Sequence, residues 1–192
     1  MKKISLFMLG CVACALSANA ALLISHAKPA TANAYLHLGS PGLVTDGRYD
    51  TWWSAGGYAT ANDPNWVTVD LLQAYPISSV TVVGADTGES YWKDFTVEFV
   101  LRGSLDNSAW VGLGSGILYD NPIWESRAES FDVGGTEYRY IQVYSTAGQH
   151  WTSIAQIEVF AVPEPSTYLA GALMLMPFAA AGVRAFRRTR IV

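Results

Sequence analysis

Residues 34–162 contain no helical pattern of useful length, and this constrains the fold more than any other feature of the sequence. Short runs rich in Val, Ile, Thr and aromatic residues recur there instead, separated by Gly, Asn, Asp and Pro. In the clearest run, Val67, Val69 and Leu71 alternate with polar residues and would share one face of a strand. The pattern predicts an all-β domain, a jelly-roll β-sandwich. The expected strands are residues 66–72, 77–83, 95–101, 138–145 and 154–160.

The amino-terminal segment has the order of a secretory signal peptide. Lys2-Lys3 precede an apolar run, which the small-residue triplet Ala18-Asn19-Ala20 follows. We therefore expect residues 1–20 to be removed. The alternative is an uncleaved membrane anchor, although the apolar run is shorter than the ~20 residues of a membrane span. The two cysteines, Cys11 and Cys14, lie in this segment, so the exported domain would have no disulfide.

The carboxy-terminal segment predicts a transmembrane helix. Pro163, Glu164 and Pro165 precede an apolar stretch that nearly reaches the length of a membrane span, and four arginines between positions 184 and 190 follow it. These arginines would hold that end in the cytoplasm. The order of Pro-Glu-Pro, one apolar helix and an arginine cluster resembles the PEP-CTERM sorting signal of Gram-negative bacteria. The resemblance implies processing by an exosortase, an integral membrane enzyme. A plain membrane anchor is the alternative.

These segments predict an exported domain with a targeting signal at each end. The expected divisions are a signal peptide (1–20), a leader (21–33), a β-sandwich domain (34–162) and a sorting signal with a transmembrane helix (163–192). The protein would cross the inner membrane, remain anchored until processing, and then lie at the cell surface or outside the cell. Residues 21–162 contain six basic and fifteen acidic residues, a net charge of −9. Such a domain would repel phosphate backbones, which disfavours nucleic-acid binding.

Several short motifs stand in a fixed order along the central domain. They are Asp46-Gly47, Thr51, Trp53, residues 66–71, 93–98, 104–110, 139–141 and 154–159. This series resembles the coagulation factor 5/8 type C, or discoidin-like, domain, which is a galactose-binding-type jelly roll. Bacterial members of that family are often family 32 carbohydrate-binding modules. The resemblance covers roughly residues 34–160 and implies a β-sandwich that binds ligands with loops at one end and performs no chemistry.

The resemblance also implies a structural calcium ion in sugar-binding relatives, bound by the turn with the Asp-Gly motif and by a Glu in the last strand. In this sequence Asp46, Asp50 and Thr51 could supply oxygen ligands. Arg48 stands where Asp or Asn is common, and it cannot bind a metal. Gln156 stands in place of the Glu, and its carbonyl oxygen could bind without charge. Calcium therefore stays open as a cofactor, and we expect it to bind weakly and to stabilise little.

Sugar binding requires exposed aromatic side chains for stacking and a few converging polar groups. The candidate loops are residues 54–65, 84–92 and 147–152. Trp92 and Trp151 are the best stacking platforms, with Glu89 and His150 as polar partners. The full set of candidate ligand-binding residues is Tyr58, Asp86, Glu89, Trp92, His150 and Trp151.

The sequence offers no constellation that favours an enzyme. The three histidines are scattered, and the glycine-rich segment 112–116 lacks the Ser-centred pattern of a nucleophile elbow, so we expect it to be a flexible loop. Trp53, Trp66 and Trp110 are expected in the core or at its edge. Two functions stay open. One is a lectin-like module that binds exopolysaccharide or another glycan. The other is a structural or protein-binding component of the cell surface or matrix.

Overall fold

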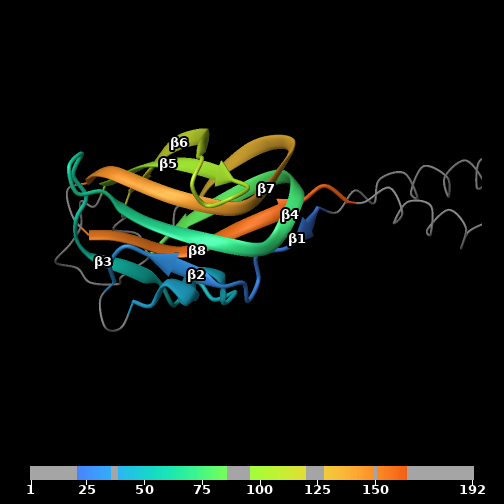
Figure 1. Ribbon diagram of the computed structural model, residues 1–192. Coiled ribbons are helices and arrows are strands. Elements are labelled where there is room, and N and C mark those ends of the chain that lie inside the picture. The colour runs from blue at the N-terminus through green and yellow to red at the C-terminus, as the bar shows by residue number, and fades with distance from the viewer. Residues whose placement is uncertain (1–20, 36–38, 86–95, 120–127, 149–150, 164–192) are drawn as a thin grey trace, which may run out of the picture. The chain divides into compact units, whose positions relative to one another are not determined.

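A computed structural model describes residues 21–35, 39–85, 96–119, 128–148 and 151–163. Residues Ala21–Val162 form one compact unit, whose described residues contain eight strands and a short 3-10 helix (Figure 1). Its elements are β1 (Leu22–Leu23), β2 (Ala30–Ala32), η1 (Pro41–Thr45), β3 (Trp53–Tyr58), β4 (Asn65–Gly84), β5 (Thr96–Ser104), β6 (Val111–Tyr119), β7 (Ala128–Gly148) and β8 (Trp151–Ala161). The all-β prediction is confirmed. Within the described ranges, no helix is long and apolar enough to span a bilayer.

Two long strands, β4 and β7, connect the layers of the sandwich. The first half of β4 pairs with β2 and with the second half of β7, whereas its second half pairs with β8 and with the first half of β7. The register of the β4–β7 ladder shifts between Asp70 and Tyr75, where Leu72 has a positive φ of 73°. The predicted strands 66–72 and 77–83 are therefore one strand with a bend, and β7 bends beside it (Figure 1).

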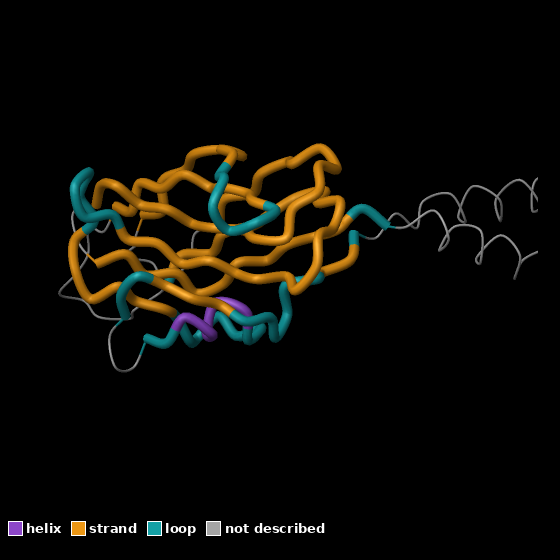
Figure 2. Tube along the Cα trace, in the orientation of Figure 1, coloured by secondary structure: helices purple, strands orange, loops and turns teal. Residues whose placement is uncertain are grey.

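The strand pairs in the described residues are all antiparallel and belong to one continuous hydrogen-bonded sheet, in the order β1-β8-β4-β7-β5-β6. β2 pairs with β4 and β3 pairs with β8 at the sides of this path. The helix η1 packs against β8, β2 and β3 on one side of the domain (Figure 2). This topology buries one face of each layer in a shared core.

The core contains the alternating residues that the sequence pattern predicts. Val67, Val69 and Leu71 of β4 are fully buried, and each such side chain contributes about 1.5–3 kcal/mol when removed from water. Trp53 is also fully buried, and its indole Nε1 donates a hydrogen bond of 2.9 Å to the Ala34 carbonyl oxygen. Trp66 and Trp110 are half-buried. The expectation of a core position is confirmed for Trp53. Trp66 lies instead on the outer face of the sheet, opposite Tyr144 and on the side away from the buried Val67.

The prediction of a flexible loop at residues 112–116 is wrong, because this segment lies inside β6. β6 pairs with β5 from Val111 to Tyr119. Two of its glycines, Gly114 and Gly116, make room for aromatic rings. A Cβ atom on Gly114 would overlap Cδ1 of Phe131 and lie 2.8 Å from Cε1 of the same ring, and one on Gly116 would lie 2.9 Å from Cζ of Phe99. The absence of side chains is thus a packing requirement of this strand.

Residues 21–33, expected as a leader, contribute β1 and β2 to the sheets. Ile24 and Ser25 between these strands are buried, and Ser25 Oγ accepts a hydrogen bond of 3.0 Å from the Val159 N–H. The start of the described chain therefore packs beside the last strand, β8.

Candidate ligand-binding site

Strand ends that are far apart in the sequence meet at one end of the domain, and we call this the loop end. The pairings that define it are Tyr58 with Trp151, Asn65 with Ser145, Gly84 with Ile154 and Val97 with Gly148. β3 ends there, β4 begins and ends there because of its bend, β5 begins there, β7 ends there and β8 begins there (Figure 1). The three sequence segments predicted to bind ligand therefore start or finish at the same place.

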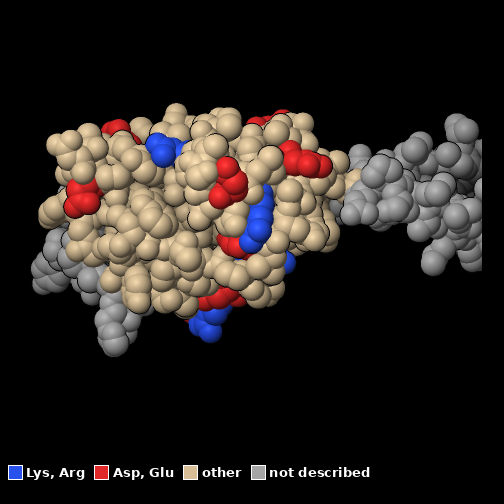
Figure 3. Space-filling model, in the orientation of Figure 1, with Lys and Arg blue, Asp and Glu red and all other residues tan. Residues whose placement is uncertain are grey.

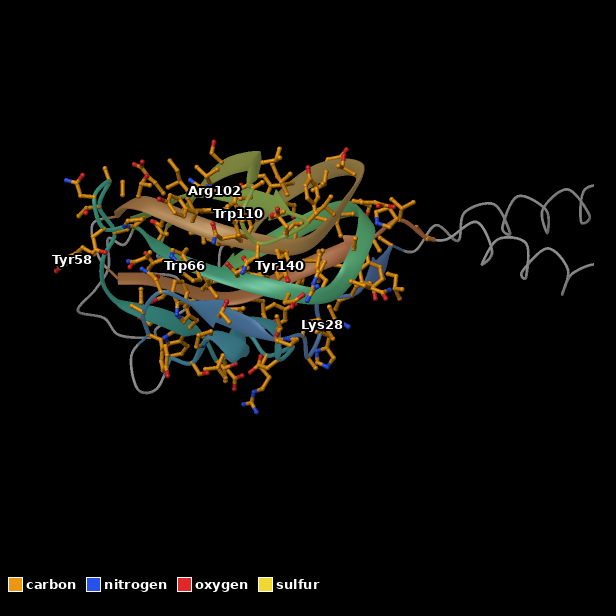
Figure 4. The ribbon with its side chains drawn as sticks, viewed as in Figure 1. Lys28, Tyr58, Trp66, Arg102, Trp110 and Tyr140 are labelled. Atoms are coloured by element: carbon orange, nitrogen blue, oxygen red, sulfur yellow. The ribbon has the colours of Figure 1, made fainter. Side chains whose placement is uncertain are left out.

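Tyr58 projects from the loop end, as Figure 4 shows. Its side chain is 55% exposed, and its backbone lies opposite Trp151. A register shift between Ser54 and Tyr58, with Gly56 at a φ of 72°, marks a bulge in β3. Bulges change the direction in which the following side chain points. Residues 54–58, predicted as part of a loop, form a strand, and this strand positions Tyr58.

The structure thus brings together the backbones of two predicted ligand-binding residues, Tyr58 and Trp151. The side chain of Trp151 lies outside the described residues. The other predicted ligand-binding residues, Asp86, Glu89, Trp92 and His150, lie outside them as well.

Asn65 connects three strands by hydrogen bonds at the loop end. Its buried Nδ2 donates to the Gly57 carbonyl oxygen at 2.9 Å and to Thr152 Oγ1 at 3.1 Å, which links β4 to β3 and β8. Sequence reasoning missed this residue. The available signal was an Asn at the first position of an alternating apolar strand, where Asn is uncommon unless its amide has partners.

The loop between β3 and β4 is held from its other side by Asn33. The Asn33 amide donates to the Pro64 carbonyl oxygen at 2.7 Å and accepts from the Trp66 N–H at 2.9 Å. Within the loop, the backbones of Thr60 and Asp63 exchange hydrogen bonds of 3.0 and 3.2 Å. The loop therefore has a defined conformation, which lowers the entropic cost of binding a ligand.

A second group of aromatic residues lies on the outer face formed by β4, β5 and β7 (Figure 4). The guanidinium of Arg102 stacks 3.4 Å from the ring centroid of Tyr144, and Trp66 pairs with Tyr144 across the strands. All three side chains are half-buried, and those of Arg102 and Tyr144 contact each other. The arrangement fits packing of the outer face, with the cation–π contact adding to its stability.

The ionised side chains of Asp70 and Arg139 have a structural role. Asp70 accepts a hydrogen bond from the Leu72 N–H and also forms a two-point ion pair with Arg139 at 2.8 and 2.9 Å. The Arg139 hydrogen bond lowers the pKa of Asp70, so this carboxyl group stays ionised. In the face shown in Figure 3, acidic and basic side chains are scattered among many uncharged ones.

The turn after η1 contains the residues considered for calcium. Gly47 has a φ of 79°, and Asp46 Oδ1 accepts from the Arg48 N–H at 2.9 Å, so the predicted Asp-Gly turn is confirmed. Asp46, Thr51 and Gln156 lie together: Thr51 Oγ1 donates to Asp46 Oδ2 at 2.7 Å, and Gln156 Nε2 donates to Asp46 Oδ1 at 2.7 Å. The carboxylate of Asp50 instead pairs with Arg48.

The oxygen atoms of this turn accept hydrogen bonds from the side-chain amide of Gln156. The amide therefore occupies the position that a metal ion would need. Among the described residues, no group of three or more His, Cys, Asp or Glu side chains could hold a metal ion. The arrangement fits an amide better than it fits calcium, which requires six to eight oxygen ligands.

Comparison with known protein families identifies the domain. The family model for the F5/8 type C domain matches residues 28–160. The chain belongs to the F5/8 type C family. The resemblance to the F5/8 type C domain, predicted from the motifs quoted above, is therefore confirmed. Comparison with curated proteins finds no match.

Several solved structures share the fold of this domain. The family 32 carbohydrate-binding module of NanJ from C. perfringens, in complex with galactose, is 19% identical, with a TM-score of 0.58, and the match covers 73% of this chain and 98% of that chain. The CBM32 of AlyQ, in complex with 4,5-unsaturated mannuronic acid, is 22% identical, with a TM-score of 0.54, covering 69% and 93%. A Streptococcus pneumoniae fucose binding module is 23% identical, with a TM-score of 0.54, covering 73% and 96%.

At these identities the similarity establishes the fold. The match covers nearly all of each of those three chains, so in each solved structure this fold makes up nearly the whole chain. A fragment of residues 21–162, which includes every described strand, is therefore a suitable object for experiments.

Proposed function

We propose that this protein is a non-catalytic carbohydrate-binding module that binds a glycan with its loop end. The observation that supports the proposal most directly is the meeting of strand ends from β3, β4, β5, β7 and β8 in an F5/8 type C fold. The three solved relatives described above are carbohydrate-binding or fucose-binding modules by name. A rigid set of strands that presents loops at one end is suited to ligand binding.

The proposed glycan is neutral or weakly basic. The net charge of −9 over residues 21–162 repels polyanions within the screening length of ~8 Å at physiological salt. Stacking on aromatic faces needs no ions, because it buries the C–H surface of a sugar ring. Tyr58, Trp92 and Trp151 would supply such faces, and Glu89 and His150 would orient the sugar by hydrogen bonds to its hydroxyl groups.

The proposal includes export to the cell surface. Residues 1–20 would act as a signal peptide, and Pro163, Glu164 and Pro165 would mark the segment recognised by an exosortase in the inner membrane. The module would then hold exopolysaccharide, or another glycan, at the surface or in the matrix. Intact-mass measurement of protein from the native host tests this part, because a mature mass that retains residues 168–192 would contradict exosortase processing.

A glycan array with the 21–162 fragment tests the binding function. We expect retention of at least one neutral glycan. Tyr58→Ala and Trp151→Ala should each weaken that retention about tenfold or more, corresponding to the loss of ~1.4 kcal/mol of stacking, without a large change in melting temperature. Trp92→Ala should act in the same way.

Tyr49→Ala is the matched control. Tyr49 is 53% exposed, similar to Tyr58, but it donates a hydrogen bond to Glu158, seven residues along β8 from Trp151 or roughly 23 Å in an extended strand. Its removal should leave retention unchanged. Unchanged binding by a folded Trp92→Ala/Trp151→Ala variant would contradict binding at the loop end. Absence of retention on every glycan would favour a protein-binding or structural role.

A further inference from the structure

The side-chain amide of Gln156 lies at the centre of the turn that follows η1, and we propose that it takes the place of a bound cation there. The domain would hold this turn closed with a neutral amide and would need no calcium to fold. This inference rests on the contacts of one side chain and is independent of the proposed glycan binding.

Three oxygen atoms of the turn surround Gln156 Nε2. Asp46 Oδ1 lies at 2.7 Å, the Arg48 carbonyl oxygen at 2.6 Å and the Leu43 carbonyl oxygen at 3.1 Å. Calcium–oxygen distances are about 2.3–2.6 Å, so these oxygens enclose the amide nitrogen much as they would enclose an ion. Both amide hydrogens consequently have acceptors.

The other atom of the amide fixes its orientation. The Gly47 N–H donates to Gln156 Oε1 at 3.3 Å. If the nitrogen and oxygen were exchanged, Oε1 would face three acceptors without a hydrogen, and Nε2 would face a donor. Gln156 is only 3% exposed, so these mismatched groups would also be shielded from water. The network therefore has one consistent assignment, with the NH2 group toward the oxygens.

The turn also satisfies the oxygens of its central carboxylate, Asp46, with hydrogen bonds alone. Asp46 accepts hydrogen bonds from the Arg48 N–H, the Thr51 hydroxyl and the Gln156 amide, which together satisfy both of its oxygens. The neighbouring carboxylate of Asp50 is exposed and engaged by Arg48 at 3.0 and 2.8 Å. A calcium ion would have to displace the buried amide and would gain a single carboxylate at the centre, and low ligand charge gives weak calcium affinity.

A single substitution should convert this amide-closed turn into a calcium-dependent one. Gln156→Glu keeps the shape of the side chain but places a carboxylate oxygen where the NH2 group was. That oxygen would face Asp46 and two carbonyl groups with no hydrogen between them. Two carboxylates and two carbonyl oxygens are the hard ligands that calcium prefers, so added calcium should relieve the repulsion.

The experiment measures the melting temperature of the 21–162 fragment in 1 mM EDTA and in 5 mM CaCl2, by circular dichroism. For the wild type we expect the two values to agree within about 1 °C. For Gln156→Glu we expect a lower value in EDTA and a rise of about 4–8 °C in calcium, which corresponds to a dissociation constant of roughly 0.1–1 mM. Gln156→Met is the matched control, because it removes the hydrogen bonds without adding charge and should not respond to calcium.

A calcium-induced rise of more than about 3 °C for the wild type would overturn the inference, since an ion would then bind despite the amide. Equal melting temperatures of Gln156→Glu in EDTA and calcium would also overturn it, because the oxygens would not form a cation position. If Gln156→Glu is unfolded in EDTA, recovery of its β-sheet spectrum on addition of calcium supports the inference. Failure to recover contradicts it.

Discussion

The glycines of β6 lead to a prediction that the structure makes quantitative. Gly114 faces the ring of Phe131, and a methyl group at this position would overlap Cδ1 and approach Cε1 to 2.8 Å. The ring has little freedom to retreat, because Phe131 also packs edge-to-face on Phe99, with centroids 5.8 Å apart and an interplanar angle of 81°. We therefore expect Gly114→Ala to force a shift of the ring or of the strand.

Gly112 provides the control within the same strand. A Cβ atom on Gly112 would meet nothing within 4 Å, and neither glycine has a positive φ. Alanine in place of glycine in a strand usually stabilises by about 0.5–1 kcal/mol, so Gly112→Ala should be neutral or slightly stabilising. Overpacking costs about 1–3 kcal/mol, so Gly114→Ala should lose roughly 1–2 kcal/mol net. For a domain of this size, that loss lowers the melting temperature by about 4–8 °C.

Urea unfolding of the 21–162 fragment, followed by circular dichroism, measures both changes. The loss in Gly114→Ala should shrink in a Phe131→Leu background, because the smaller side chain leaves room for the methyl group. Equal stabilities of Gly112→Ala and Gly114→Ala would refute the reasoning. A loss in Gly114→Ala that persists unchanged in the Phe131→Leu background would refute it too.

Two further predictions concern polar groups. Asn65→Ala leaves the Gly57 carbonyl and the Thr152 hydroxyl without their donor, so it should lower the free energy of unfolding in urea by about 1–3 kcal/mol and weaken glycan retention. Retention equal to wild type in the folded variant would show that Asn65 does not position the loop end. Backbone N–H groups of Ala109 and Ser108 hold the pKa of Asp106 well below its usual range. The ionised Asp106 carboxylate therefore stabilises the fold above about pH 4, and this stabilisation is lost as the pH falls through the pKa that Asp106 has in the folded state. Asp106→Asn should therefore be less stable than wild type at pH 7, and the difference should narrow at pH 3; a difference that is constant with pH would contradict this cause.

The sequence predicted those features of the fold that depend on residues close together along the chain. Val67, Val69 and Leu71 alternate with polar residues, and a strand must place such residues on one face. The Asp46-Gly47 turn is equally local, since the Asp carboxylate reaches an amide two residues on and the Gly supplies the positive φ. These features needed no knowledge of the rest of the chain.

The features that escaped prediction depend on distant residues. Segment 112–116 has no side-chain pattern of its own. Its strand conformation comes from pairing with β5, and Phe131, which lies beyond it in the sequence, explains the glycine at position 114. The carbonyl oxygen of Gln156 was considered as a ligand, whereas in the structure its NH2 group faces the oxygens of a turn more than 100 residues earlier. The backbones of Tyr58 and Trp151 meet only through the register of β3 with β8.

Under the proposed function, stability and glycan binding depend on different parts of this domain, and this separation decides how the effects of substitutions should be interpreted. Buried apolar side chains of β4, β5, β7 and β8 supply the core, where replacement of a large residue by alanine costs about 2–5 kcal/mol. Tyr58 is exposed at the loop end, and the loop that follows it is held by the amides of Asn33 and Asn65. Exposed substitutions there should change stability by no more than about 0.5 kcal/mol. A loop variant that loses glycan binding at an unchanged melting temperature therefore identifies a ligand contact, whereas a variant that loses both assigns the residue to the scaffold.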